Sequence, residues 1–134
     1  MKKFLLLLML CFFFSIKGAQ AKHLNLEKTY QNAWCNANCG KQEVILWDKT
    51  RIDCLTQTHA IEFDFASKWA ESIGQSLYYG HATDKKPGIV LIMEDYEKDK
   101  KYLDRLNTVA KRYGITVWTM TPADLNNINK LALP

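Results

Sequence analysis

Five apolar residues in succession, Ile89 to Met93, limit the folds open to this chain. Neighbouring side chains of a strand point to opposite faces of a sheet, so a short strand without polar residues must be covered on both faces. Helical patterns over 67–79 and 96–113 flank this run, and each has an apolar stripe suited to packing on a sheet. We therefore expect an α/β fold with helices packed against a sheet.

The remaining patterns predict the order helix, three strands, helix, strand, helix, strand, helix. Helices are expected over 24–34, 67–79, 96–113 and from Pro122, and strands over 43–47, 51–55, 60–65, 89–93 and 115–120. Asn25 is expected to cap the first helix, and Gly80 to end the second. Tight turns predict an antiparallel hairpin at the start of the sheet, and the later helices predict right-handed crossovers between parallel strands. The predicted fold class is α/β, with a mixed sheet flanked by helices.

A secretory signal peptide is predicted over residues 1–21. Lys2 and Lys3 precede an apolar stretch, and Ala19-Gln20-Ala21 is a small-x-small cleavage site. The stretch is shorter than the roughly 20 residues that span a bilayer, which disfavours the alternative of a retained anchor. Cleavage leaves a single domain over 22–134, exported to the periplasm or secreted and without a membrane anchor. Three of the 18 Lys and Arg residues leave with the signal, so 15 face 14 acidic residues in the mature chain.

Three cysteines remain in the mature chain, an odd number for an oxidising compartment. Cys35 can pair with Cys39, or either of them can reach Cys54, and the spacing does not choose between these pairs. A zinc site is the less favoured alternative, because the chain has no second closely spaced cysteine pair and its histidines are scattered. At most one intramolecular disulfide is expected.

Three acidic residues occupy the strands over 51–55 and 60–65. If Gln57 and Thr58 form the turn, Asp53 lies opposite Glu62, and alternation adds Asp64 to the same face. The opposite face is apolar and consists of Ile52, Cys54, Ile61, Phe63 and Phe65. The hairpin is therefore expected to have one core face and one acidic face.

The repulsion between the carboxylates of such a cluster must be offset. Two bare carboxylates about 4 Å apart repel by roughly 4 kcal/mol at an effective dielectric constant near 20. The cost falls if one acid has a raised pKa, if Lys49, Arg51 or Lys68 forms ion pairs with the cluster, or if the carboxylates hold a divalent cation. The residues alone leave these three alternatives open.

The helix predicted over 67–79 has polar side chains beside its apolar stripe. The apolar stripe consists of Trp69, Ala70, Ile73 and Leu77. A second, polar stripe is formed by Lys68, Glu71, Gln75 and Tyr79. Because the helix follows closely on Asp64, Lys68 can reach back toward the acids, or it can form an ordinary exposed pair with Glu71.

Together these motifs resemble the PD-(D/E)XK nuclease superfamily. The resembling residues are Ile52-Asp53, then Glu62-Phe63-Asp64, then Gln75 with Tyr79, which is similar to the Gln-x-x-x-Tyr signature of RecB-like members. Glu27 lies on the first predicted helix, where many members carry a further acid. The resemblance runs from about Glu43 to Met93, and the order of elements extends it over most of the mature chain.

The resemblance implies a restriction-endonuclease-like fold and the hydrolysis of phosphodiester bonds in DNA or RNA. Asp53 and Glu62 would be catalytic residues that hold Mg²⁺ or Mn²⁺, with Asp64 as an additional metal ligand. Gln75, Tyr79 and Glu27 would position the nucleic-acid substrate. Each of these roles is an expectation that follows from the resemblance.

One residue departs from the family pattern. Asp64 occupies the position of the motif lysine, which in the family orients the attacking water and offsets charge in the transition state. Lys68, one helical turn further on, is the expected substitute and third catalytic residue, since this lysine is displaced onto the following helix in some members. If Lys68 does not serve, the chain is a catalytically inactive module that binds nucleic acid or a protein partner. A disulfide-linked structural protein is a third alternative.

Overall fold

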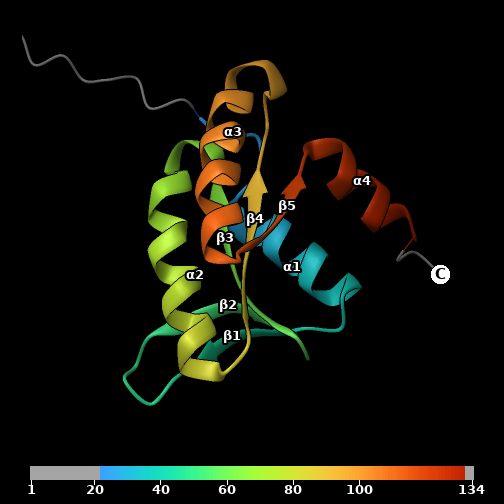
Figure 1. Cartoon of the computed structure of the whole chain (residues 1–134). Coiled ribbons are helices and arrows are strands. Elements are labelled where there is room, and N and C mark those ends of the chain that lie inside the picture. The colour runs from blue at the N-terminus through green and yellow to red at the C-terminus, as the bar shows by residue number, and fades with distance from the viewer. Residues whose placement is uncertain (1–21, 132–134) are drawn as a thin grey trace, which may run out of the picture.

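The computed structural model describes residues 22–131, and the signal peptide predicted over 1–21 lies outside this range (Figure 1). The helices are α1 (Glu27–Ala37), α2 (Trp69–Thr83), α3 (Tyr96–Tyr113) and α4 (Pro122–Leu131). The strands are β1 (Lys41–Ile45), β2 (Arg51–Leu55), β3 (His59–Phe65), β4 (Lys86–Ile92) and β5 (Thr116–Met120), and a short 3₁₀ turn, Ala66–Lys68, precedes α2. Within the described range, no helix is long and apolar enough to cross a membrane.

The strands form one five-stranded sheet in chain order, from β1 to β5. The first three strands pair antiparallel, and β3, β4 and β5 pair parallel. The order of elements is the predicted one, and the α/β class with a mixed sheet flanked by helices is confirmed.

β4 is buried on both faces. Val90 and Ile92 pack in a core with residues of α1 and α4, whereas Ile89 and Leu91 pack in a core with residues of α2 and α3. Figure 1 shows the four helices that supply these two cores. Each of these four side chains has no measurable exposure to solvent. The uninterrupted apolar run is therefore explained by two helical layers, one on each side of the sheet.

The boundaries of α2 and α1 differ from the prediction. α2 continues through Gly80 to Thr83 and ends at Asp84, which takes the left-handed conformation with φ 52°. Gly80 is needed for close approach, since a Cβ there would lie 3.0 Å from the Lys85 carbonyl oxygen. α1 begins three residues later than predicted, and the Asn25 side chain donates to the Tyr30 hydroxyl, with no side-chain cap at the helix start.

Glu94, just after β4, holds the segment that leads into α1. Its carboxylate accepts hydrogen bonds from the backbone N–H groups of Leu24 (2.9 Å) and Asn25 (3.1 Å) and from the Tyr30 hydroxyl (2.9 Å). Burial alone would raise the pKa of Glu94, but these hydrogen bonds outweigh it and hold the pKa below its ordinary value. The start of α1 is thereby tied to the sheet.

The disulfide joins Cys35 on α1 to Cys54 on β2, which selects one of the three predicted pairings. Cys39 is exposed and has a free thiol. Gly40 lies against the bond, because a Cβ there would be 2.4 Å from the Cys54 Sγ. The disulfide therefore fixes α1 against the hairpin that carries the acidic residues.

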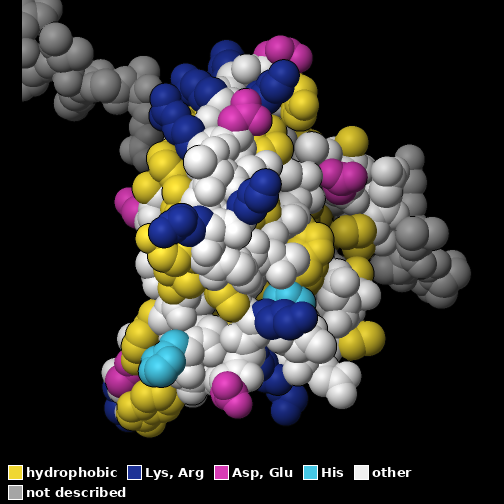
Figure 2. All heavy atoms as spheres, in the orientation of Figure 1, with side chains coloured by type: hydrophobic (Ala, Val, Ile, Leu, Met, Phe, Trp, Pro, Cys, Tyr) yellow, Lys and Arg dark blue, Asp and Glu magenta, His cyan; other side chains and the backbone are white. Residues whose placement is uncertain are grey.

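α3 forms a locally basic face, although residues 22–134 contain nearly equal numbers of basic and acidic residues, 15 and 14. Its sequence contains six Lys or Arg residues and three Asp or Glu residues. Figure 2 shows Lys and Arg side chains gathered over this helix on the viewed face. Basic and acidic residues are thus nearly equal in number overall but are unevenly distributed over the surface.

Candidate active site

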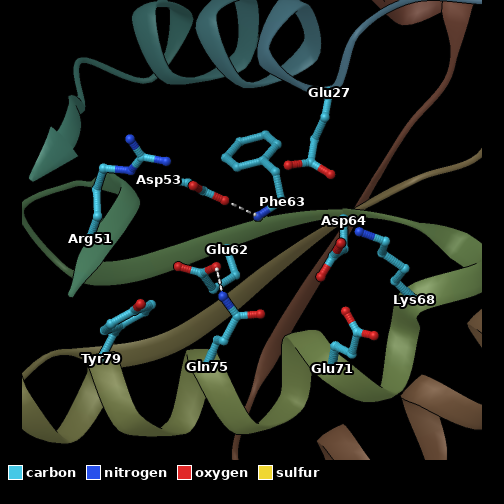
Figure 3. A pocket seen from close by; sticks show the side chains of 10 residues that line it. All are labelled: Glu27, Arg51, Asp53, Glu62, Phe63, Asp64, Lys68, Glu71, Gln75 and Tyr79. Atoms are coloured by element: carbon cyan, nitrogen blue, oxygen red, sulfur yellow. Dashed lines mark hydrogen bonds between the residues drawn. The ribbon is translucent and has the colours of Figure 1, made fainter.

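A pocket of about 420 Å³ lies among the start of α1, the strands β2 and β3, and one side of α2 (Figure 3). It is lined by Glu27, Asp53, Glu62, Asp64, Lys68, Gln75 and Tyr79, which include every residue proposed from the sequence for catalysis, metal binding and substrate positioning. Arg51, Phe63 and Glu71 complete the lining. The fold thus gathers side chains from α1, β2, β3, the 3₁₀ turn and α2 into one concave, acidic surface.

Asp53 lies at a break in the hairpin. The pairing of β2 with β3 ends at Cys54 and Ile61, and the Asp53 carboxylate accepts the Phe63 N–H at 2.9 Å. The predicted backbone pairing of Asp53 with Glu62 is therefore wrong, because a side chain replaces the strand bond at this point. The predicted turn is correct, since Leu55 pairs with Ala60 as expected.

This break also changes which faces the neighbours of Asp53 occupy. Ile52 packs with Ala60 and Tyr79 beneath α2, whereas Cys54 packs with Cys35 beneath α1. Regular alternation would place residues 52 and 54 on the same face, as the sequence predicted. The placement of Ile52 was therefore wrong, and the irregular backbone at Asp53 is the reason.

Glu62 is the most deeply buried acid of the pocket, with 2% of its surface exposed. One carboxylate oxygen, Oε2, accepts from the Gln75 Nε2 at 3.1 Å (Figure 3). The other, Oε1, has no hydrogen-bond partner among the residues that the structure describes. Burial, reinforced by the negative charge of Asp53, raises the pKa of Glu62 to about 9.

The other acids of the pocket are shifted in the same direction. Burial and the charge of Glu27 raise the pKa of Asp64 to about 7, and Lys68 partly opposes that rise. Burial also raises the pKa values of Asp53 and Glu27. A raised pKa, one of the three forms of compensation considered above, is thus present at four carboxyl groups.

Ion pairs do not compensate the cluster. Among the side chains that the structure describes, those of residues 22–128, no Lys or Arg nitrogen lies within 4.0 Å of the carboxylates of Asp53, Glu62 or Asp64. Arg51 pairs with Glu43 instead, at 2.9 Å. Lys68 is exposed and extends toward Asp64 in Figure 3. It therefore acts on the cluster through its longer-range charge.

α2 supplies the polar wall of the pocket. Glu71, Gln75 and Tyr79 line it from successive turns, as their helical spacing predicts. Among the residues expected on the apolar stripe, Ala70 is exposed, and that placement was wrong. Trp69, Ile73 and Leu77 pack against the core on the α3 side, as expected.

Sequence reasoning missed Gln31 and Glu43. Gln31 is 2% exposed, and its Nε2 donates to the Asp53 carbonyl oxygen and to Glu43 Oε1, each at 2.7 Å. Gln31 follows Glu27 by four residues, so the two share one face of α1. That spacing is the signal that would have connected Gln31 to the pocket.

The donor atoms of the pocket suit a hard divalent cation. Mg²⁺ is commonly held by one or two carboxylates together with water and substrate phosphate. The pocket offers the carboxylates of Asp53 and Glu62 as metal ligands. Glu62 Oε1 accepts no hydrogen bond in the described structure, so it is free to bind a cation. Over residues 22–131, no three His, Cys, Asp or Glu side chains are grouped closely enough to hold a metal ion together. A cation in this pocket would therefore need ligands beyond these side chains, such as backbone carbonyl oxygens, water or substrate phosphate.

Comparisons with protein-family models, with curated proteins and with solved structures found no match to this chain. We therefore interpret the pocket from its own side chains.

Proposed function

We propose that the mature chain is an exported, metal-dependent nuclease with a restriction-endonuclease-like fold, which hydrolyses phosphodiester bonds in DNA or RNA. The observation that carries this proposal is the buried acidic cluster, in which Glu62 Oε1 has no partner among the described residues and no Lys or Arg forms an ion pair. Burying these carboxyl groups is costly, and without a cation the cost appears as their raised pKa values. A bound cation would remove that cost. The antiparallel hairpin followed by parallel strands also supports the proposed fold.

Asp53 and Glu62 would hold Mg²⁺ or Mn²⁺, with Asp64 beside them as the additional acid. When bound, the cation would supply activation of water and neutralisation of charge on the scissile phosphate. Lys68 would place its positive charge near the developing negative charge. Gln75 fixes the Glu62 carboxylate through its hydrogen bond and, with Tyr79, forms the wall against which the substrate backbone would lie.

The protonation of Glu62 links cation binding to pH. With a pKa of about 9, Glu62 carries a proton at neutral pH when no cation is present. A cation competes with that proton, so binding releases it into solution. Affinity for the cation is therefore expected to rise as the pH approaches 9.

One observation favours a second candidate, a catalytically inactive module that binds nucleic acid or a protein partner. Asp64 stands where the family motif has a lysine, and the Lys68 amine is not within 4.0 Å of the Asp53 or Glu62 carboxylate in the described structure. Such a module would keep the shape of the pocket without cleaving a substrate.

Incubation of residues 22–134 with labelled DNA and RNA, with Mg²⁺, Mn²⁺ or EDTA, tests the proposal. We expect cation-dependent cleavage that is lost in Glu62→Ala and retained in Glu97→Ala, which removes an exposed carboxylate on α3. Equal cleavage by Glu62→Ala and the wild-type chain would refute the assignment of the site. Binding without cleavage in every condition would favour the inactive module.

A further inference from the structure

The backbone is irregular at two neighbouring positions of the sheet. Pairing of β1 with β2 includes Gln42 with Cys54 and Val44 with Ile52, but no pair joins Glu43 to Asp53 between them. Glu43 has φ 55°, a left-handed conformation that a residue with a side chain rarely adopts. Both strands have the same number of residues across the break, so an inserted residue does not cause it.

The Gln31 side chain links Glu43 and Asp53, which do not pair with each other through their backbones. Its amide nitrogen lies between the two strands and donates to Asp53 through the main chain and to Glu43 through the carboxylate, each at 2.7 Å. A buried amide with two short hydrogen bonds is held in one orientation. One side chain of α1 thus connects the irregular residues of β1 and β2.

Glu43 is held in this conformation by further contacts. Its carboxylate lies 2.6 Å from the Lys28 amine and 2.9 Å from the Arg51 Nε. Hydrogen bonds from Lys28 and Gln31 hold the pKa of Glu43 below its ordinary value. These contacts offset the backbone strain, which the surrounding structure must compensate if the left-handed conformation is to persist.

From this geometry we infer that Gln31 and Glu43 are positioning residues, which hold the Asp53 backbone so that its carboxylate stays at the Phe63 N–H on the rim of the pocket. Neither residue is among those that line the pocket, so both would act through Asp53. Part of this inference rests on the proposed function, because Asp53 is a ligand only if a cation binds. The orientation of Asp53 can be measured independently of any cation.

The test uses ¹⁵N-labelled residues 22–134 and the Gln31→Met variant, which keeps the side-chain length and removes both hydrogen bonds. In the wild-type chain, the Phe63 amide should exchange slowly with deuterium from the solvent, a protection we call the Phe63 response, since the Asp53 carboxylate accepts its hydrogen bond. In Gln31→Met this response should disappear. Calorimetric titration with Mn²⁺ should show an affinity reduced by about 10- to 100-fold, as for other residues that orient metal ligands.

Gln42→Met is the matched control. The Gln42 Nε2 donates to Asn36 Oδ1 at 2.6 Å, so this variant also removes a hydrogen bond between β1 and α1 but leaves Asp53 untouched. We expect it to keep the Phe63 response and the Mn²⁺ affinity of the wild-type chain. If Gln31→Met also keeps both, the inference is overturned.

Two further outcomes separate this inference from the proposed function. If Gln31→Met does not fold, the same measurements can be made on Glu43→Ala, since Glu43 lies on the half-exposed edge strand β1. An unchanged Phe63 response in Glu43→Ala would overturn the inference. Failure of the wild-type chain to bind Mn²⁺ would refute the proposed function. The Phe63 measurement would then still decide whether Gln31 and Glu43 position Asp53.

Discussion

Without divalent cations, the protein should lose stability as the pH rises, and Glu62 should cause the loss at alkaline pH. Its pKa is about 9 in the folded protein, against an ordinary value of 4.5. Between these values the folded state keeps a proton that the unfolded state has released, so the free energy of unfolding falls with rising pH. Asp64 contributes in the same direction from 3.8 up to its pKa of about 7, which leaves Glu62 as the principal acid from pH 7 to 9.

The expected size of this loss follows from the linkage relation. Each pH unit well below the folded pKa of Glu62 costs about 1.4 kcal/mol, and this slope falls off as the pH reaches that pKa, so about 2 kcal/mol is lost between pH 7 and pH 9. For a domain of this size the loss lowers the melting temperature by roughly 10 °C. A cation that binds the folded state at 100 times its Kd restores about 2.7 kcal/mol.

Urea titrations in EDTA at several pH values from 5 to 9, followed by circular dichroism, measure this dependence. Glu62→Gln removes the titrating group, so between pH 7 and 9 its free energy of unfolding should fall by about 2 kcal/mol less than that of the wild-type chain. Glu97→Gln, on the exposed face of α3, should follow the wild-type profile. Parallel profiles for wild type and Glu62→Gln would refute a protonated, buried Glu62.

Two further predictions concern packing and covalent structure. Reduction of the Cys35–Cys54 disulfide, whose cysteines are 19 residues apart in the sequence, should lower the free energy of unfolding by about 3 kcal/mol in denaturant titrations, whereas Cys39→Ser should leave it unchanged. Gly88→Ala should destabilise the domain by about 1–3 kcal/mol, because the new Cβ would lie 2.9 Å from Trp118 and 3.0 Å from Ile61. The new Cβ of Gly74→Ala meets no atom within 4 Å, so this variant should stabilise α2 by about 0.5–1 kcal/mol. Thermal melts in which both glycine variants shift the melting temperature in the same direction would contradict this account.

Periodicity was sufficient to predict the element order and the acidic face of β3. Alternation along β3 predicts that Phe63 points away from Glu62 and Asp64. In the structure the Phe63 side chain packs in the core with α1, whereas Glu62 and Asp64 point toward α2 (Figure 3). Helical spacing likewise placed Gln75 and Tyr79 on one side of α2, where they line the pocket. These features depend on local geometry that repeats along a strand or helix, so a single sequence contains them.

The remaining features depend on contacts between distant segments. At the irregular backbone of Asp53, Gln31 from α1 donates to the Asp53 carbonyl oxygen, and the neighbouring Glu43 of β1 is left-handed. Neither residue has a local sequence signature of this arrangement. Gly80 was misread as a helix end because a glycine needed for close packing and a glycine needed for a left-handed turn are identical in sequence. The later start of α1 similarly reflects the distant carboxylate of Glu94.

The position of the disulfide in the chain also bears on how molecules can exchange strands. β1 lies at one edge of the sheet, and exposed edge strands are common points of association between protein molecules. Cys35 and Cys54 enclose the whole of β1 in a covalent loop, so β1 cannot leave its own domain by unfolding from either terminus. Swapping of β1 between two copies of the chain would require threading a closed loop or breaking the sulfur–sulfur bond. In an oxidising compartment, the same bond that fixes the acidic hairpin thus also opposes domain-swapped aggregation.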